Sequence, residues 1–187
     1  KLEKICSKES FSGIVGFVHV RWATHGVPNE INAHPHSNES VSVVHNGIIE
    51  NSTILKKLLE KKGYKFKSQT DTEVITALLS ENLKKNTPLV AIQKTLEKLH
   101  GSYALGILFK DNPDLIVGAR RGSPLAVGYG NNENYLGSDS YALKSMTNKI
   151  SYLENGEICL LTKDNAEFYN SKGKKINKKI LTLSEDS

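Results

Sequence analysis

The second half of the sequence is divided into short apolar runs, and the spacing of these runs restricts the possible folds more strongly than any other feature. From residue 101 onward, seven runs of strand length follow one another, at 102–109, 115–119, 125–127, 135–137, 150–153, 157–161 and 167–169. Turn-forming sequences such as Asn155-Gly156 lie between them, and such pairs favour tight hairpins. We therefore expect a series of antiparallel strands, with one short helix near residues 140–146.

The first half of the sequence predicts strands followed by helices. The β-branched run at 13–20 indicates a buried strand, and the run at 41–44 indicates a second strand that ends in a sharp turn at Asn46-Gly47. Residues 64–67 are expected to add a short strand. Capping residues predict three helices, which begin near Asn51, Thr70 and Thr87.

The first of these helices should run to residue 62. Its apolar stripe would consist of Ile54, Leu55, Leu58 and Leu59. Strands, then helices, then antiparallel strands make an α+β fold in which sheet packs on sheet and the helices lie outside.

Composition narrows the function. The 187 residues, 38% hydrophobic and 24% charged, suit one globular domain. The net charge of +5 comes from lysines that are interleaved with glutamates and have few aromatic neighbours, which argues against nucleic-acid binding. No apolar run reaches membrane-spanning length, so we expect no membrane partner. Cys6 and Cys159 show no disulfide spacing, which favours a reducing, cytoplasmic compartment.

Most of the polar chemistry lies between residues 19 and 51. This stretch holds the single tryptophan and five of the six histidines. The imidazoles of His25, His34, His36 and His45 are of a type that binds transition metals. However, the nearby carboxylates are only Glu30 and Glu39, and neither H-E-x-x-H nor paired-cysteine spacing occurs. We predict no metal and no cofactor.

Neither cysteine stands out as a nucleophile. Cys6 lies in a charged arm with nothing nearby to lower its pKa, and Cys159 lies between Ile158 and Leu160 as a small buried hydrophobe would. The sequence also lacks the G-x-S-x-G elbow of serine hydrolases and the G-x-x-x-x-G-K loop that binds phosphate.

A recognition pattern is more informative. Arg21 at a strand end suits bidentate capture of a carboxylate. Asp71 at a helix start could hold an ammonium group, or could serve as the helix N-cap. Asn46-Gly47 can offer a side-chain amide beside a backbone N–H, the two donors of an oxyanion hole. Together these groups describe a site for an amino-acid amide.

Three motifs between His19 and Val74 carry a family resemblance. They are H-V-R-W-A-T-H-G with N-A-H-P-H, then V-V-H-N-G-I-I-E-N, then T-D-T-E-V. These motifs resemble the class II glutamine amidotransferases, and within them the glutaminase domain of the glucosamine-6-phosphate synthase family. The later H-G-S-Y-A-L-G, A-R-R-G-S-P-L and G-S-D-S-Y-A-L stretches are similar to the same domain, so the resemblance covers nearly the whole chain.

The resemblance implies an N-terminal-nucleophile hydrolase with a four-layer αββα sandwich of two mainly antiparallel sheets. A terminal cysteine, with its own α-amino group as base, would hydrolyse glutamine through a thioester to glutamate and ammonia. Ammonia would then pass to fructose 6-phosphate to give glucosamine 6-phosphate. The implied roles are glutamine carboxylate binding by Arg21 with Thr24 and His25 alongside, ammonium binding by Asp71, the oxyanion hole at Asn46 and Gly47, and ammonia gating by Trp22.

The sequence departs from the family pattern at its start. Lys1 carries no thiol and the family's opening C-G-I-V-G-like strand is absent, so we expect residues 1–187 to be an amidotransferase domain without its first strand and nucleophile, and inactive alone. Residues 172–187 are expected to begin a linker to sugar-isomerase domains, through which the polypeptide could form a homodimer. The competing hypothesis is a non-catalytic domain that senses glutamine or retains a vestigial pocket.

Overall fold

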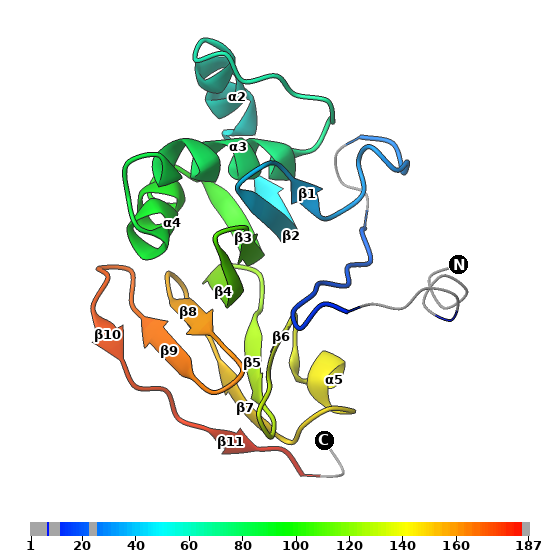
Figure 1. The fold of residues 1–187 in the computed structure, drawn as a ribbon, viewed down its shortest axis with the longest axis vertical. Coiled ribbons are helices and arrows are strands. Elements are labelled where there is room, and N and C mark those ends of the chain that lie inside the picture. Colours follow the sequence, from blue (N-terminus) through cyan, green and yellow to red (C-terminus); the bar gives the residue numbers. More distant parts are fainter. Residues whose placement is uncertain (1–6, 8–11, 23–25, 185–187) are drawn as a thin grey trace.

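Two antiparallel sheets form the centre of the molecule (Figure 1). The computed structural model describes residue 7, residues 12–22 and residues 26–184. The seven-stranded sheet has the order β1-β2-β3-β4-β8-β9-β10. Its strands are β1 (His36–Ser37), β2 (Val41–Ile49), β3 (Gly101–Phe109), β4 (Asn112–Arg121), β8 (Ile158–Leu161), β9 (Ala166–Tyr169) and β10 (Lys175–Ile176).

The four-stranded sheet has the order β11-β7-β5-β6. It consists of β11 (Leu181–Thr182), β7 (Lys149–Tyr152), β5 (Ala126–Tyr129) and β6 (Asn134–Gly137). Each neighbouring pair of strands in both sheets is antiparallel. The short runs after residue 101 therefore form strands, as their turn signals predicted.

Helices cover the outer faces of both sheets. On the large sheet lie α2 (Ser52–Glu60), α3 (Asp71–Leu83) and α4 (Pro88–Leu96), joined to it by a core that includes Ile75, Leu79 and Leu105. The short α5 (Ser140–Leu143) buries Leu143 against the small sheet. The apolar residues between the sheets include Leu125, Val127, Cys159, Leu161 and Phe168. These layers are the predicted αββα sandwich, whose fourth layer consists of one short helix within the described residues.

Gly118 shows how closely the sheets approach. A Cβ atom at this position of β4 would lie 2.7 Å from the sulfur of Cys159 and 2.8 Å from Leu136 in the other sheet. Real Cβ atoms do not approach other heavy atoms this closely, so any larger residue at position 118 would force Cys159 and Leu136 to shift.

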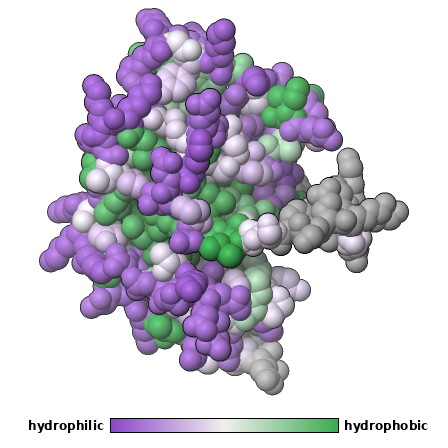
Figure 2. All heavy atoms as spheres, viewed as in Figure 1, coloured by the Kyte–Doolittle hydropathy of each residue, from purple (hydrophilic) through white to green (hydrophobic). Residues whose placement is uncertain are grey.

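The segment at 13–20 corrects one prediction. It is extended, but within the described residues it joins neither sheet, and its outward side chains Ile14, Val18 and Val20 are 80%, 78% and 92% exposed. Phe17 and His19 on the other side are partly covered. Exposed and partly covered side chains alternate as they do in a strand that packs on one face. For the segment to be buried as predicted, a neighbouring strand would also have to pair with it. On the face drawn in Figure 2, hydrophilic side chains predominate and many apolar side chains lie toward the middle.

Further predictions were wrong in their bounds or burial. β2 continues through Asn46-Gly47 to Ile49 with no sharp turn, because β3 pairs with it along its whole length. In α2 only Leu55 and Leu59 are buried, while Ile54 and Leu58 are 64% and 53% exposed, because the helix touches the body along a narrow stripe. Residues 64–67 form no strand.

The C-terminal region contributes one short strand to each sheet. β10 pairs with β9, and β11 pairs with β7 in the other sheet. Between them, the ammonium group of Lys178 lies 2.8 Å from the carboxylate of Glu157. Residues 175–182 thus contribute two short strands to the sheets, and the linker to sugar-isomerase domains stays a prediction. None of the helices in the described ranges has the length and apolar character needed to cross a membrane.

Candidate active site

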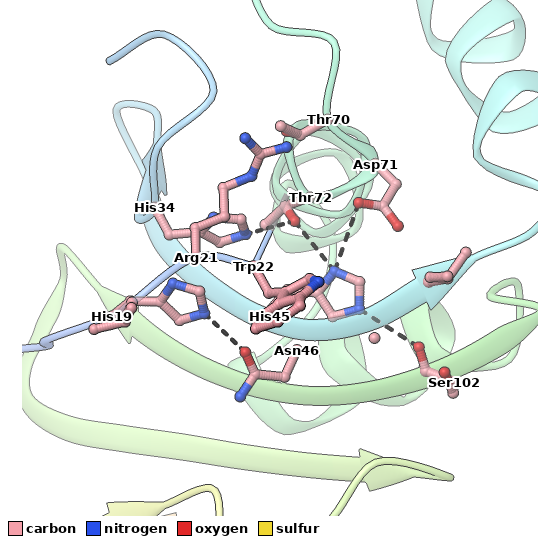
Figure 3. Close-up of a pocket in the computed structure, with 13 residues that line it drawn as sticks. His19, Arg21, Trp22, His34, His45, Asn46, Thr70, Asp71, Thr72 and Ser102 are labelled. Atoms are coloured by element: carbon pink, nitrogen blue, oxygen red, sulfur yellow. Dashed lines mark hydrogen bonds and ion pairs between the residues drawn. The ribbon is translucent and has the colours of Figure 1, made fainter. Parts of the chain in front are cut away.

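A pocket of about 370 Å³ lies where β2 passes under the start of α3 (Figure 3). Five parts of the chain line it: residues 19–22, His34, the second half of β2, residues 70–72 at the start of α3, and Ser102 at the start of β3. Pairing of β2 with β3 brings Ser102 opposite Ile48. Segments far apart in the sequence thus meet here. They include five of the seven predicted site residues: Arg21, Trp22, Asn46, Gly47 and Asp71.

Asp71 is the buried charge of the pocket, with 7% of its surface exposed. Its Oδ2 accepts a hydrogen bond of 2.8 Å from the backbone amide of Ile49 at the end of β2. The N-cap of α3 is Thr70, whose hydroxyl accepts from the backbone amide of Glu73. Asp71 is therefore not the N-cap of α3, which was one of the two roles that the sequence allowed. It lies in the first helical turn, where the helix dipole favours a negative charge.

Thr72 links two histidines above β2. Its hydroxyl lies 2.8 Å from Nε2 of His34 and 3.1 Å from Nδ1 of His45. Nε2 of His45 lies 3.5 Å from the carbonyl oxygen of Ser102, which can only accept. A neutral His45 therefore carries its hydrogen on Nε2, and the Thr72 hydroxyl donates to His45 Nδ1 while accepting from His34. Nδ1 of His45 is also 3.7 Å from Oδ1 of Asp71.

His34 is held neutral by its surroundings. Burial lowers its pKa to about 3, and the neighbouring imidazoles of His19, His36 and His45 and the guanidinium of Arg21 act in the same direction. Burial also lowers the pKa of His36, whose Nε2 lies 2.8 Å from the hydroxyl of Thr70. These bonds fasten the loop at residues 34–36 to the beginning of α3.

Asn46 and Gly47 lie inside β2, opposite Ala104 and Tyr103 of β3. Oδ1 of Asn46 is 2.9 Å from Nε2 of His19 (Figure 3). Gly47 has a φ of +133°, and a Cβ atom there would overlap the carbonyl group of Ser102. This backbone conformation and close approach require glycine.

Arg21 and Trp22 enter the pocket from the extended segment. The Arg21 guanidinium donates hydrogen bonds of 3.4 Å to the carbonyl oxygens of Val27 and Gly26, and Figure 3 shows it on the same side of β2 as Thr70 and Asp71. Trp22 is 91% exposed at the pocket. Thr24 and His25, the other two predicted substrate-binding residues, lie outside the described residues.

Sequence reasoning missed several pocket residues, among them His19, Thr72 and Ser102. His19 could have been found, because residues two apart on an extended segment share a face and Arg21 is therefore its neighbour. No local signal marks Thr72 or Ser102, which reach the pocket through helix and strand packing. Within the described ranges, no three histidine, cysteine or acidic side chains are arranged to hold a metal ion.

An αββα sandwich whose pocket combines an arginine, a buried aspartate and an Asn-Gly pair is the architecture of a glutamine amidotransferase domain. The family model of the glutamine amidotransferase domain matches residues 19–145. The chain belongs to this family, which confirms the resemblance inferred from the motifs.

Individual relatives are more specific. The chain is 49% identical over 179 residues to a glutamine–fructose-6-phosphate aminotransferase (isomerizing) of Mesorhizobium japonicum, covering 95% of this chain and 30% of that protein. It is 46% identical over 187 residues to the enzyme of the same name from Caldanaerobacter subterraneus, covering 99% and 31%. The chain thus spans about 30% of the length of these curated relatives.

Solved structures give the same fold. A glutamine phosphoribosylpyrophosphate amidotransferase from B. subtilis, complexed with ADP and GMP, is similar with a TM-score of 0.67 and 26% identity. The similarity covers 82% of this chain and 34% of that one. A structure described as the allosteric regulatory enzyme of purine biosynthesis has a TM-score of 0.65 and 28% identity over the same shares.

Proposed function

We propose that this chain is the glutaminase domain of a glutamine–fructose-6-phosphate aminotransferase. It would hydrolyse glutamine to glutamate and deliver the ammonia to fructose 6-phosphate at sugar-isomerase domains of the same polypeptide. The observation that supports this most is the convergence of Arg21, Asp71 and Asn46-Gly47 on one pocket. Glutamine presents a carboxylate, an ammonium group and a side-chain amide, and each finds a complementary group there.

Binding would use the two charges. The guanidinium of Arg21 is a planar fork that can hold the α-carboxylate with two parallel bonds. The buried carboxylate of Asp71 would accept from the α-ammonium group, and because it is only 7% exposed, water screens this attraction weakly. Trp22, with Thr24 and His25, would complete the substrate site, and Trp22 would control the passage of ammonia.

Catalysis would stabilise the charge that develops on the amide oxygen. A thiolate attacks the amide carbon, the oxygen becomes an oxyanion, and donation from the Asn46 amide and the Gly47 backbone would stabilise it. Ammonia then leaves, and water hydrolyses the thioester to glutamate. Cys159 is unsuited to this attack, because burial raises its pKa to about 12. The proposal takes the attacking thiol from the amino-terminal cysteine that the family resemblance implies.

Substitution of Arg21 tests the substrate assignment. In the complete polypeptide, Arg21→Ala should raise KM for glutamine by about tenfold to a hundredfold, because a charge-assisted bond contributes about 1.5–3 kcal/mol, with a smaller change in kcat. Arg21→Lys keeps the positive charge but loses the planar fork of the guanidinium group. Its KM for glutamine should therefore lie between those of the unsubstituted protein and Arg21→Ala. An unchanged KM in Arg21→Ala would contradict the role of Arg21 in carboxylate capture.

The nucleophile and the partner domains need their own test. Mass spectrometry of the mature parent polypeptide should find a terminal cysteine, and residues 1–187 by themselves should release no ammonia from glutamine. Steady turnover by residues 1–187 that survives both Cys6→Ala and Cys159→Ala would exclude this mechanism. A cytoplasmic location and a homodimer formed through the sugar-isomerase domains belong to the same proposal.

A further inference from the structure

His19 occupies a position that the proposed reaction leaves without a role. It lies on the packed side of the extended segment, two residues before Arg21, and lines the pocket. The segment has no ladder of its own within the described residues. Side-chain contacts such as those of His19 therefore fix where this part of the chain lies relative to β2.

The His19–Asn46 contact has a direction. Nε2 of His19 is 2.9 Å from Oδ1 of Asn46, an oxygen that can only accept. The hydrogen must therefore be on Nε2. The other ring nitrogen, Nδ1, is buried and has no hydrogen-bond partner. In the tautomer with its hydrogen on Nε2, the buried Nδ1 is an acceptor without a donor. The opposite tautomer would instead bury an unpaired N–H group at Nδ1, which is the rarer and costlier arrangement.

The ring of His19 is itself held in place. It stacks on the ring of His34 with centroids 4.4 Å apart and an angle of 24° between the planes. His34 is bonded in turn to the hydroxyl of Thr72, which is 1% exposed at the start of α3. Burial keeps the pKa of His34 at about 3, so the stack places a neutral ring against His19.

The two partners of His19, the side-chain amide of Asn46 and the ring of His34, lie on opposite faces of β2 (Figure 3). His45 is on the face covered by α3 and buried, whereas the next residue, Asn46, points to the other face and is exposed. The backbone of Asn46 is fixed by pairing with Ala104, so rotation of its side-chain amide is what remains to be set. With Oδ1 directed to His19, the NH2 group is left free to donate.

We infer that His19 is a positioning residue, which holds the Asn46 amide with its oxygen turned to the imidazole and its NH2 group available to the oxyanion. This inference rests on the proposed function for its catalytic meaning. The hydrogen bond and the tautomer stand without it. His19 would touch no reacting atom and would act only through Asn46.

A matched pair of substitutions separates positioning from support of the fold. In the complete polypeptide, His19→Gln keeps an N–H that can donate to Oδ1 of Asn46. The glutamate of His19→Glu has nearly the same shape as glutamine but carries only hydrogen-bond acceptors. It would therefore attract the NH2 group of Asn46 and turn Oδ1 of Asn46 toward the substrate. We expect H19E to lower kcat by about a hundredfold or more, the effect of losing an oxyanion donor, and H19Q to lower it by about tenfold at most. KM for glutamine should change by less than about threefold in both. Equal losses of kcat in the two variants would overturn the inference.

A second measurement does not depend on turnover. Nitrogen-15 NMR of the histidine side chains should show His19 as the Nε2–H tautomer, and Asn46→Ala should change its ring shifts. An Nδ1–H tautomer would overturn the inference even in an active enzyme. Calorimetric titration with glutamate separates the two proposals: failure to bind glutamate counts against the proposed function, while the NMR result still decides whether His19 donates to Asn46.

Discussion

The carboxylate of Asp71 accepts a hydrogen bond of 2.8 Å from the backbone amide of Ile49, and this bond joins the first turn of α3 to the last residue of β2. A buried carboxylate is thereby fixed beside the Asn46-Gly47 pair. One oxygen is committed to the backbone, and the other lies 3.7 Å from His45. Asp71 therefore stabilises the fold through its bond to Ile49 and, in the proposed function, also binds the ammonium group of the substrate.

Asp71→Asn should separate these two roles. The amide oxygen can still accept from Ile49, so we expect the free energy of unfolding to fall by only about 1 kcal/mol. The negative charge is lost, so KM for glutamine should rise by about tenfold to a hundredfold in the complete polypeptide, the loss expected for a charge-assisted bond. Urea unfolding and steady-state kinetics measure the two effects. The control is Asp164→Asn, because Asp164 is 64% exposed on a loop; similar kinetics in the two variants would refute the charge argument.

Gly47→Ala should damage both the fold and the proposed oxyanion hole. The φ of +133° strains any other residue, and the added Cβ would overlap the carbonyl group of Ser102 in the paired strand. We expect a loss of about 2–4 kcal/mol in unfolding free energy, from backbone strain and a displaced strand. Gly16→Ala is the control, since a Cβ there meets nothing within 4 Å. Equal stability of the two variants by thermal unfolding would contradict this reading of β2.

Protonation of His34 should make the fold weaker in acid. Its pKa is about 3 in the folded chain against an ordinary 6.5, so the unfolded chain binds the proton first as the pH falls. The stability due to the neutral ring is complete above pH 6.5 and is lost progressively between pH 6.5 and 3. We expect a loss of about 2 kcal/mol, less than the full shift implies because water reaches part of the ring.

His34→Gln tests this effect, because glutamine can still donate to Thr72 but does not titrate in this range. Urea unfolding of both proteins at pH 7, 6, 5 and 4 measures the pH slope. A smaller slope in H34Q supports the assignment, and an unchanged slope would place the acid sensitivity elsewhere.

Cys159 should be unreactive in the folded protein. It is fully buried between the sheets, and this burial raises the pKa of its thiol to about 12. With so little thiolate, alkylation by iodoacetamide at pH 8 should be at least about a thousandfold slower than for a free cysteine. Peptide mass spectrometry should detect modification of Cys159 only after denaturation. Rapid labelling of Cys159 in the native protein would show that the packing around Gly118 opens readily.

The motifs between His19 and Val74 were enough to indicate the family, because they resemble those of the class II glutamine amidotransferases. The charged and donor groups by themselves described only a site for an amino-acid amide. Turn signals after residue 101 were enough to predict antiparallel strands, since hairpin turns are local. Helix starts at Thr70 and Thr87 were equally local, as N-caps act within one turn.

The tertiary structure decided what depends on partners distant in the sequence. Pairing with β3 carries β2 through Asn46-Gly47, where local propensity predicted a turn. The absence of such a pairing within the described residues leaves the apolar row at Ile14, Val18 and Val20 exposed. Thr72, Ser102 and His19 reach the pocket only because α3, β3 and the extended segment meet at one end of β2. Sequence patterns record which groups a chain carries and how each residue prefers to bend, whereas packing determines which faces are covered and which groups meet.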